Sequence, residues 1–263
     1  MARRTGLVVT LDGRVHTAHT PLVRADDPLF SRGDGVFETL LVRAGSPCLL
    51  DAHLARLGPP DEAPWRRAVA VAVGEWGDAD EGVLRMVYGR EMSFVAVSPV
   101  PARVAAARRD GVAAITLARR VVDGPWTTAR VKSSSYAINA AALRQAALMG
   151  AGDAVFVDTD GEVLEGPRSS VVAAVDGGLV TPPAALPILP GTTVAALFGV
   201  ARDGGVACAE STLTVANLFA AQGVWLLSAV TLAARVHTLD GIALGAADGV
   251  DMAGLINVAV ALG

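Results

Sequence analysis

A single lysine is the most distinctive chemical feature of this sequence. Lys132 is the only lysine in the chain, and the rest of its 22 lysine-plus-arginine positions are arginines. An arginine cannot replace a lysine whose amine must lose its proton and attack a carbonyl, because guanidinium stays charged and is not nucleophilic. Lys132 is therefore a candidate Schiff-base lysine. An unremarkable lysine left in an arginine-rich chain explains this one observation equally well.

Three further positions could complete a site around such a lysine: Arg56, Glu165 and the helix start Gly191-Thr192-Thr193. An enzyme that uses pyridoxal 5'-phosphate (PLP) needs a lysine, an acid beside the pyridine nitrogen and an anion site for the phosphate. The free N–H groups and the dipole of a helix N-terminus favour a phosphate. Each residue alone has a plainer explanation as a solvated arginine, an exposed hairpin carboxylate or a helix cap.

The composition sets limits on the class of protein. Hydrophobic residues make up 52% of the chain and the net charge is -4, which suggests neither disorder nor nucleic-acid binding. Cys48 and Cys208 are expected to be core thiols of a reducing compartment. No metal site is predicted, because the histidines form no ligand-like cluster; they are His16, His19, His53 and His237.

We expect a cytoplasmic protein. Arg3-Arg4 is followed by an apolar run too short and too charged to be an export signal. Residues 211–234 contain no charged residue. This uncharged stretch is long enough to suggest a membrane span. Because polar residues and Gln222-Gly223 interrupt this stretch, we predict instead a helix at 215–221, a turn and a buried strand at 224–228.

The order of predicted elements indicates an α/β (α+β) protein with two domains, joined near Asp123-Gly124-Pro125. Residues 1–123 form a predicted α+β domain, and residues 127–263 form a second domain that carries Lys132. In the first domain we expect strands near 7–10, 36–42, 47–50, 83–88, 93–97 and 113–118, with helices near 51–57, capped by Asp51, and 64–76. In the second we expect helices at 136–149, 194–202 and 215–221, with strands at 154–157, 163–165, 170–175, 179–181 and 224–228.

The chain closely resembles the class IV aminotransferases, the fold-type IV PLP enzymes. The matching segments span nearly the whole chain in the family's order. They are Gly33-Asp34-Gly35-Val36-Phe37-Glu38-Thr39, His53-Leu54-Ala55-Arg56-Leu57, the segment from Val131 to Asn139, Leu164-Glu165-Gly166-Pro167-Arg168-Ser169-Ser170, Leu189-Pro190-Gly191-Thr192-Thr193 and Leu239-Asp240-Gly241.

The resemblance implies a two-domain D-amino acid aminotransferase-like PLP fold, with a smaller N-terminal α/β domain and a larger, β-barrel-like C-terminal domain. It also implies a homodimer whose site lies between the two domains and near the partner subunit. Lys132 would hold PLP and move protons, and Glu165 would pair with the pyridine nitrogen. The remaining implied cofactor contacts are Arg56, Thr192 and Thr193 at the phosphate, a further phosphate-binding turn at Ser228 and Ala229, and Tyr136 near the phenolic oxygen.

Three departures from the family pattern are visible. The helix that carries Arg56 stops early, at Gly58-Pro59-Pro60; the turn at residues 228–231 lacks the glycine of branched-chain relatives; and the C-terminus, residues 256–263, is short. The missing glycine puts the phosphate contact of the turn in doubt, and the short C-terminus puts stability or dimer contacts in doubt. The early stop after Arg56 motivates an alternative from another class, a non-catalytic member that only binds a cofactor or a metabolite.

Within the family, residues 164–169 and 231–241 are most similar to actinobacterial 4-amino-4-deoxychorismate lyases. These enzymes make p-aminobenzoate and pyruvate for folate biosynthesis. The alternative is a class IV aminotransferase that acts on D-amino acids or branched-chain amino acids, and no residue type or spacing chooses between elimination and transamination. Candidates for contact with substrate are Thr39, Arg90, Arg168 and Arg235, for each of which a surface ion pair or a plain strand position is at least as good an explanation.

Overall fold

The computed structural model describes residues 5–120, 124, 127–247 and 249–261. With those gaps, the chain divides into two compact units, one of residues 5–101 with 132–136 and the other of residues 102–131 with 137–261. The predicted junction at Asp123-Gly124-Pro125 lies, except for Gly124, outside the described residues. The two units part after residue 101, and residues 132–136 return to the first unit, so the units do not coincide with the predicted domains 1–123 and 127–263.

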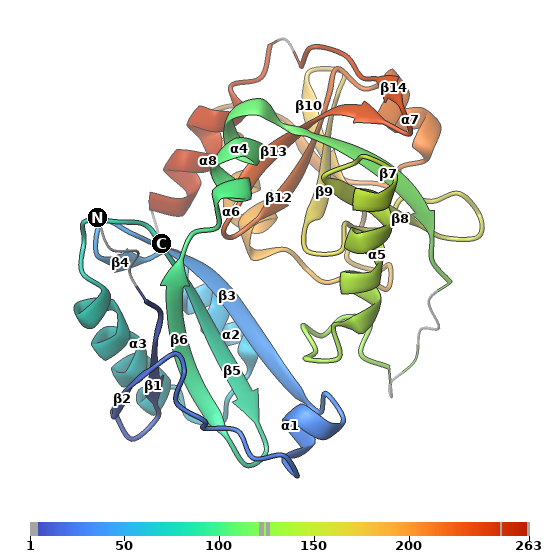
Figure 1. The fold of residues 1–263 in the computed structure, drawn as a ribbon. Helices are drawn as coiled ribbons and strands as arrows, with labels where there is room; N and C mark the ends of the chain where they lie inside the picture. Colours follow the sequence, from blue (N-terminus) through green and yellow to red (C-terminus); the bar gives the residue numbers. More distant parts are fainter. Residues whose placement is uncertain (1–4, 121–123, 125–126, 248, 262–263) are drawn as a thin grey trace. The chain divides into compact units, whose positions relative to one another are not determined.

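The first unit is built on a six-stranded antiparallel sheet in the order β2-β1-β6-β5-β3-β4. Figure 1 shows these strands in blue to green. The strands are β1 (Leu7–Thr10), β2 (Val15–Thr17), β3 (Gly35–Arg43), β4 (Ser46–Pro47), β5 (Gly82–Gly89) and β6 (Ser93–Pro99), and the helices are α1 (Pro28–Ser31), α2 (Leu50–Leu57) and α3 (Ala63–Trp76).

The two faces of this sheet have different chemistry. Because side chains alternate along a strand, Leu40 and Val42 of β3 face the same way as Leu84 and Met86 of β5, and these residues share one buried core with α2 and α3. On the opposite face, Thr39 lies across from Arg85 in the strand register. One face of the sheet thus holds this apolar core, and the other carries Thr39 and Arg85 among buried apolar side chains such as Leu41 and Val87.

Most predicted elements of this unit are confirmed, with one local error. The hairpin of β1 and β2, the β5–β6 pair and the helix that starts around Pro64 are all present. The predicted strand at 47–50 is wrong, because β4 ends at Pro47 and α2 begins at Leu50. Leu49 occupies the N-cap position with a φ of 56°, and Asp51 lies in the first helical turn instead of capping it.

Residues 132–136 belong to the first unit because they pair with the start of β3. The backbone N–H of Phe37 donates to the Lys132 carbonyl over 2.9 Å, and the Ser134 N–H donates to the Gly35 carbonyl over 2.8 Å. An antiparallel bridge joins Val36 to Ser133. The segment that carries the lone lysine is therefore attached to a strand almost a hundred residues earlier in the chain.

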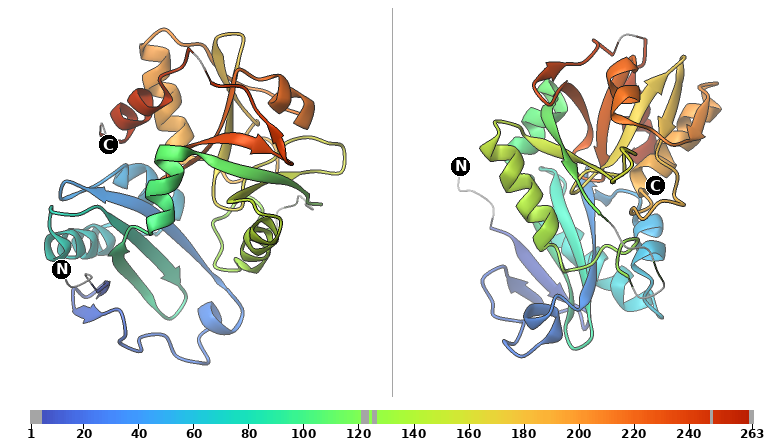
Figure 2. Two further views of the ribbon diagram at one scale, coloured as in Figure 1. Left: turned by 45° about the horizontal axis from the view of Figure 1, so that its top comes forward. Right: turned by 90° about the vertical axis from the view of Figure 1, so that its right-hand side faces the viewer.

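The second unit contains an eight-stranded sheet in the order β11-β10-β9-β12-β13-β7-β8, with β14 paired to β13. Figure 2 shows it from two further directions, and both Figures 1 and 2 place α8 beside α6. The strands are β7 (Val112–Ala118), β8 (Asp153–Val157), β9 (Ser170–Val175), β10 (Gly178–Thr181), β11 (Cys208–Glu210), β12 (Gly223–Ser228), β13 (Leu232–Leu239) and β14 (Ile242–Ala243), and the helices are α4 (Ala102–Asp110), α5 (Ala137–Leu148), α6 (Thr192–Asp203), α7 (Val215–Ala220) and α8 (Met252–Ala261).

Irregular backbone connects the two ends of this sheet, which makes it barrel-like. The Leu164 N–H donates to the Phe156 carbonyl of β8 over 2.9 Å, and the neighbouring Val163 N–H donates to the Leu213 carbonyl over 2.7 Å. Leu213 follows β11, the opposite end of the strand order. The enclosed core is apolar, with alternating residues of four strands pointing inward, among them Val155, Val171, Val224 and Val236.

Several expectations for this unit need correction. The strand predicted to complete the first domain is β7, and it pairs with β8 and β13 in the second unit. Sequence analysis missed β13 and the helices α4 and α8. In α4 only Val104 is buried, so an apolar stripe at helical spacing is absent. No helix in the described part of the chain is long and apolar enough to cross a membrane, and residues 215–228 form α7 and β12 as predicted.

Candidate active site

The predicted site residues are distributed over both units. The first unit holds Lys132, Tyr136, Arg56, Thr39 and Arg90, and the second holds Glu165, Thr192, Thr193, Ser228, Ala229, Arg168 and Arg235. Each half has an internal geometry of its own.

In the first unit, the Lys132 side chain lies beside aromatic rings. Its Nζ atom is 5.0 Å from the centroid of the Phe37 ring. Tyr136 meets the same ring edge-on, with 5.6 Å between centroids and 79° between planes. Phe37 is only 4% exposed, so it forms a fixed platform. The structure thus places Lys132 and Tyr136 against the same ring, and their implied roles at the cofactor stay predictions.

Arg85 is a charged neighbour of this platform that sequence analysis missed. Its guanidinium carbon lies 3.8 Å from the Phe37 ring centroid, and within the described residues no hydrogen bond or ion pair engages it. Arg85 is exposed overall, but the protein atoms around its guanidinium partly desolvate it and lower its pKa, while the nearby Tyr136 acts in the opposite direction; arginine nevertheless stays charged. A signal was present in the sequence, because Arg85 is a charge inside the apolar strand Val83-Leu84-Arg85-Met86-Val87.

Arg56 is held by a buried carboxylate on the other face of β3. Its Nε donates to Glu38 Oε1 over 2.6 Å, and one terminal nitrogen donates to Glu38 Oε2 over 2.8 Å. His53 Nδ1 lies 2.7 Å from the same Oε2. The Glu38 and His53 side chains are each 1% exposed, whereas that of Arg56 is 18% exposed. Glu38 and His53 lay within the quoted motifs, but the sequence alone assigned them no role.

The charge of Glu38 follows from opposing effects. Burial raises the pKa of this carboxyl group, because a low-dielectric environment disfavours its charged form. Hydrogen bonds from Arg56 and His53, together with their charges, outweigh burial, so the pKa of Glu38 is lower than its ordinary value. Glu38 is therefore an ionised group that keeps the Arg56 guanidinium in one plane.

In the second unit, Glu165 is linked to the segment that precedes α6. The Leu189 backbone N–H donates to Glu165 Oε2 over 3.1 Å. Arg119 makes a long contact of 3.5 Å with Oε1 and lies 4.7 Å from the Phe156 ring centroid. The Glu165 side chain is 13% exposed. The Glu165 carboxylate is thus held between one arginine and one backbone N–H.

The start of α6 has the features of an anion site. Gly191 is the N-cap, and no side chain caps the helix through a hydrogen bond. Thr192 and Thr193 form the first turn, and Thr193 is 3% exposed. A Cβ atom on Gly191 would lie 2.5 Å from Ser170 Oγ, so the close approach of β9 to this turn requires glycine. The backbone N–H groups and dipole of this turn suit a phosphate.

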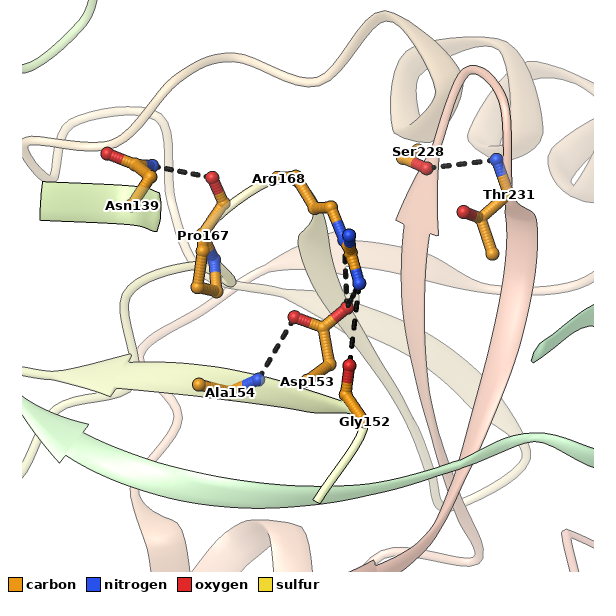
Figure 3. A network of polar contacts seen from close by, with 8 residues as sticks. All are labelled: Asn139, Gly152, Asp153, Ala154, Pro167, Arg168, Ser228 and Thr231. Carbon is orange, nitrogen blue, oxygen red and sulfur yellow. Dashed lines mark hydrogen bonds and ion pairs between the residues drawn. The ribbon is translucent and has the colours of Figure 1, made fainter. Parts of the chain in front are cut away.

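The turn at Ser228 and Ala229 is organised by its own polar atoms. The Thr231 N–H donates to Ser228 Oγ over 3.1 Å, and Arg108 of α4 donates to the Val230 carbonyl. Figure 3 shows Ser228 and Thr231 facing each other across the turn. The missing glycine therefore leaves a well-ordered turn, and the implied phosphate contact of Ser228 and Ala229 stays a prediction.

A cavity of about 310 Å³ lies next to this turn, within the second unit. Ser228 and Thr231 line it together with Arg168 and Asp153. Arg168 donates to Asp153 Oδ2 through Nε over 3.2 Å and through a terminal nitrogen over 3.1 Å, and Figure 3 shows this pair. The Arg168 charge is thus already paired inside the protein.

The other predicted substrate residues also have local partners. Arg235 donates to the Gly245 carbonyl over 2.7 Å. Arg90 lies 3.8 Å from Asp34, and both side chains are well exposed. Thr39 is half-buried opposite Arg85. Of the four, Thr39 alone lies next to the Lys132, Phe37 and Arg85 group in its unit, so substrate roles for the three arginines have little support from their contacts.

The residues fit PLP by their chemistry. An amine lies beside an aromatic platform, a carboxylate lies beside an arginine, and the N-cap glycine of α6 leaves a turn that a Cβ atom would crowd. These groups match the aldehyde, the pyridine nitrogen and the phosphate of PLP. Lys132 in the first unit would hold the aldehyde and Glu165 in the second would pair with the pyridine nitrogen. Arg56 in the first unit and the α6 turn in the second are each a candidate for the phosphate.

Comparisons with known proteins agree with this chemistry. The family described as amino-transferase class IV matches residues 35–239. The bifunctional aminodeoxychorismate lyase / D-amino acid transaminase of Mycobacterium tuberculosis is 55% identical over 89% of this chain and 92% of its own.

Solved structures give the same result. A hypothetical aminotransferase from M. tuberculosis has been solved in a PLP-bound form, which is 52% identical with a TM-score of 0.92. Its form with α-ketoglutarate and PMP is 53% identical with a TM-score of 0.93, and each form covers 97% of this chain and 98% of that one. A fold IV transaminase from Curtobacterium pusillum is 33% identical, with a TM-score of 0.89 over 98% of this chain and 97% of its own. The fold expected from the sequence is thus confirmed, and this chain belongs to the class IV aminotransferases, a family of PLP-dependent enzymes.

Proposed function

We propose that this enzyme is a 4-amino-4-deoxychorismate lyase, which converts its substrate to p-aminobenzoate and pyruvate for folate biosynthesis. The observation that carries the proposal is the 55% identity, over 89% of the chain, with a relative named for this lyase activity. The coarser statement, a class IV lyase or transaminase, rests on the family match as well. The geometry supports the proposal, because each half of the predicted site has an ordered arrangement.

PLP, when bound, supplies an aldehyde for the substrate amine and a ring that takes up electrons from the reacting carbon. In the proposed reaction the Lys132 amine takes the proton from the carbon that carries the substrate amino group. The bond between the ring carbon and the enolpyruvyl oxygen then breaks as the ring becomes aromatic. The proton that Lys132 took returns to the leaving oxygen, and the released enol tautomerises to pyruvate. Glu165 would keep a proton on the pyridine nitrogen. Arg56 and the first turn of α6 would each offer donors to the phosphate, and a fixed phosphate would help to align the reacting atoms with Lys132.

The substrate carries carboxylates, and Arg85 is the cation we propose for one of them. It stands over the Phe37 ring that also lies under Lys132. Within the described residues it has no hydrogen bond or ion pair, unlike Arg168 and Arg235. A guanidinium with its donors still available can bind a carboxylate through two hydrogen bonds. The proposal thus moves the carboxylate contact from the predicted arginines to Arg85.

A D-amino acid transaminase activity is the second candidate, because the same relative is named for both reactions. The M. tuberculosis structure with α-ketoglutarate and PMP supports α-ketoglutarate as an amino acceptor to test. Branched-chain activity has weaker support, since the archaeal relative named for it is 26% identical.

The departures that suggested a non-catalytic member do not support that alternative. The early stop after Arg56 is an ordinary helix end, in which Gly58 has a φ of 68° and its N–H donates to the Leu54 carbonyl. Arg56, two residues before this helix end, is held by two hydrogen bonds to Glu38. The short C-terminus still forms α8, which buries Met252 and Ile256. Neither departure disturbs a residue of the predicted site.

The decisive experiment supplies the PLP-loaded protein with 4-amino-4-deoxychorismate and no keto acid. Catalytic release of p-aminobenzoate and pyruvate in equal amounts is the expected result. If neither product forms while α-ketoglutarate and D-alanine yield glutamate and pyruvate, the chain is a transaminase and the lyase proposal is wrong. Absence of both reactions, with PLP bound, would support the non-catalytic alternative.

The resemblance also supports two further parts of the proposal, a homodimer and a cytoplasmic location. Sedimentation of the PLP-loaded protein tests the first, since a dimer has twice the chain mass of 26.8 kDa. A monomer that retains full activity would show that no partner subunit is needed at the site.

A further inference from the structure

The Glu38 and His53 pair is an unusual feature of the apolar face of the first unit. Both side chains are 1% exposed. Their neighbours along β3 and α2, Leu40 and Leu54, belong to the buried apolar core. A carboxylate in such surroundings costs folding free energy unless it is paired and hydrogen-bonded, and an apolar residue of similar size often serves stability as well or better. The pair therefore invites a functional explanation.

The hydrogen bonds show which group the pair controls. Glu38 accepts from both the Nε atom and one terminal nitrogen of Arg56. Two bonds from a planar guanidinium fix its plane and its rotation, so the direction of the remaining terminal nitrogen is set as well. A single bond would leave the long arginine side chain free to rotate.

His53 completes the arrangement from the opposite side. Its Nδ1 lies 2.7 Å from Glu38 Oε2, and its buried Nε2 has no hydrogen-bond partner within the described residues. An N–H at Nδ1 can donate to Glu38 over this distance, so His53 helps to orient the carboxylate.

We propose that Glu38 and His53 are positioning residues that fix Arg56 for the phosphate of PLP. This inference rests on the proposed function, in which Arg56 binds that phosphate. Glu38 offsets the positive charge of Arg56, so it does not raise the attraction of the site for a phosphate. The pair contributes instead by fixing the direction of the Arg56 guanidinium. Its removal therefore weakens the binding of PLP, which has a phosphate, and leaves the binding of pyridoxal, which has none, nearly unchanged.

The test measures the affinity of the apo-protein for PLP and for pyridoxal by equilibrium dialysis. Glu38→Gln should weaken PLP binding about 10-fold, the value of one charge-assisted hydrogen bond, and change pyridoxal binding less than about 2-fold. Glu81→Gln is the matched control, because it removes a carboxylate from the same unit, where Arg43 Nε lies 2.7 Å from Glu81 Oε1. It should change neither affinity. Thermal unfolding of each apo-variant shows whether it is folded.

Two further variants keep the test decisive if Glu38→Gln does not fold. His53→Leu removes the donor to Glu38 and should produce a smaller loss that is again confined to PLP. In an Arg56→Met background, adding His53→Leu should cause no further loss of PLP affinity, because the group that is positioned is gone.

Each contrary outcome has one meaning. Failure of the unmodified protein to bind PLP overturns the proposed function itself. Equal weakening of PLP and pyridoxal by Glu38→Gln overturns the inference, because the pair then supports the whole site. Tighter PLP binding also overturns it, since Glu38 would then act by reducing the Arg56 charge.

Discussion

The two units contain two different kinds of candidate anion-binding group. In the first unit, Arg56 is a side-chain cation held by Glu38, with His53 behind it. In the second unit, the first turn of α6 offers backbone N–H groups and a helix dipole, with Gly191 as the N-cap. The arginine site depends on three side chains, whereas the α6 site depends mainly on backbone geometry.

This difference determines how each site responds to mutation. A single substitution can remove the Arg56 guanidinium or release it from Glu38. At α6, removal of one threonine hydroxyl leaves the N–H groups and the dipole in place. The helix N-terminus is therefore the tolerant part of the proposed phosphate site, and the buried cluster on β3 and α2 is the sensitive part.

The largest effect on turnover is expected from Lys132→Ala. This change also removes the covalent bond to PLP, so the binding of PLP then depends on the two candidate anion sites and the other noncovalent contacts. Turnover should fall by about 1,000-fold or more, because the general base is lost. PLP should still bind through its phosphate. Initial rates of p-aminobenzoate formation and dialysis of PLP measure the two quantities. Complete loss of PLP binding would show that the phosphate contacts are minor.

The next largest effect is on PLP binding, and it compares Arg56 with the first turn of α6. Arg56→Met should weaken PLP binding about 10- to 100-fold, because it removes charge-assisted hydrogen bonds. Thr192→Val and Thr193→Val should each cost less than about 10-fold, the range of one neutral hydrogen bond. Titration of the apo-proteins with PLP measures all three. A larger loss at α6 than at Arg56 would reverse the comparison.

A third substitution separates substrate binding from phosphate binding. Arg85→Met keeps an extended side chain over the Phe37 ring but removes the charge. The KM for 4-amino-4-deoxychorismate should rise about 10-fold or more, because a charged hydrogen bond to carboxylate is lost, while PLP affinity stays unchanged. Steady-state kinetics with saturating PLP measure KM. An unchanged KM would remove Arg85 from the substrate site.

A smaller effect tests whether the α6 site depends on close backbone packing. Gly191→Ala would place a Cβ atom 2.5 Å from Ser170 Oγ and should destabilise the protein by about 1 kcal/mol or more. Ser170→Ala removes that oxygen, so the double variant should regain most of the loss. Urea unfolding of the single and double variants measures the coupling. Additive losses would show that some other contact excludes a side chain here.

The smallest effect is expected at Arg90. Arg90→Ala breaks an exposed contact of 3.8 Å with Asp34 and should change stability by less than about 0.5 kcal/mol. Turnover and KM should also stay the same. Kinetics beside those of Arg85→Met provide the check. A large rise in KM would restore Arg90 as the substrate residue in place of Arg85.

The failures of the sequence-based predictions have physical causes. Hairpins with Asp-Gly turns and amphipathic helices such as α3 depend on neighbouring residues, so they were predictable. The assignment of β7 to the wrong unit arose because its partners, β8 and β13, lie far along the chain. Arg85 was overlooked because its importance depends on Phe37 and Lys132, which are distant in sequence.

The sequence by itself determined the chemical inventory and the family: a lone lysine, an acid, an anion-binding helix start and motifs in a recognisable order. These depend on residue types and short spacings. The tertiary structure alone decided which charges are already used. Arg168 is paired with Asp153, and Arg56 is held by a buried Glu38, whereas Arg85 has no hydrogen bond or ion pair with the residues that the structure describes. The reason is physical, because pairing and burial of a charge depend on distances between residues far apart in the chain.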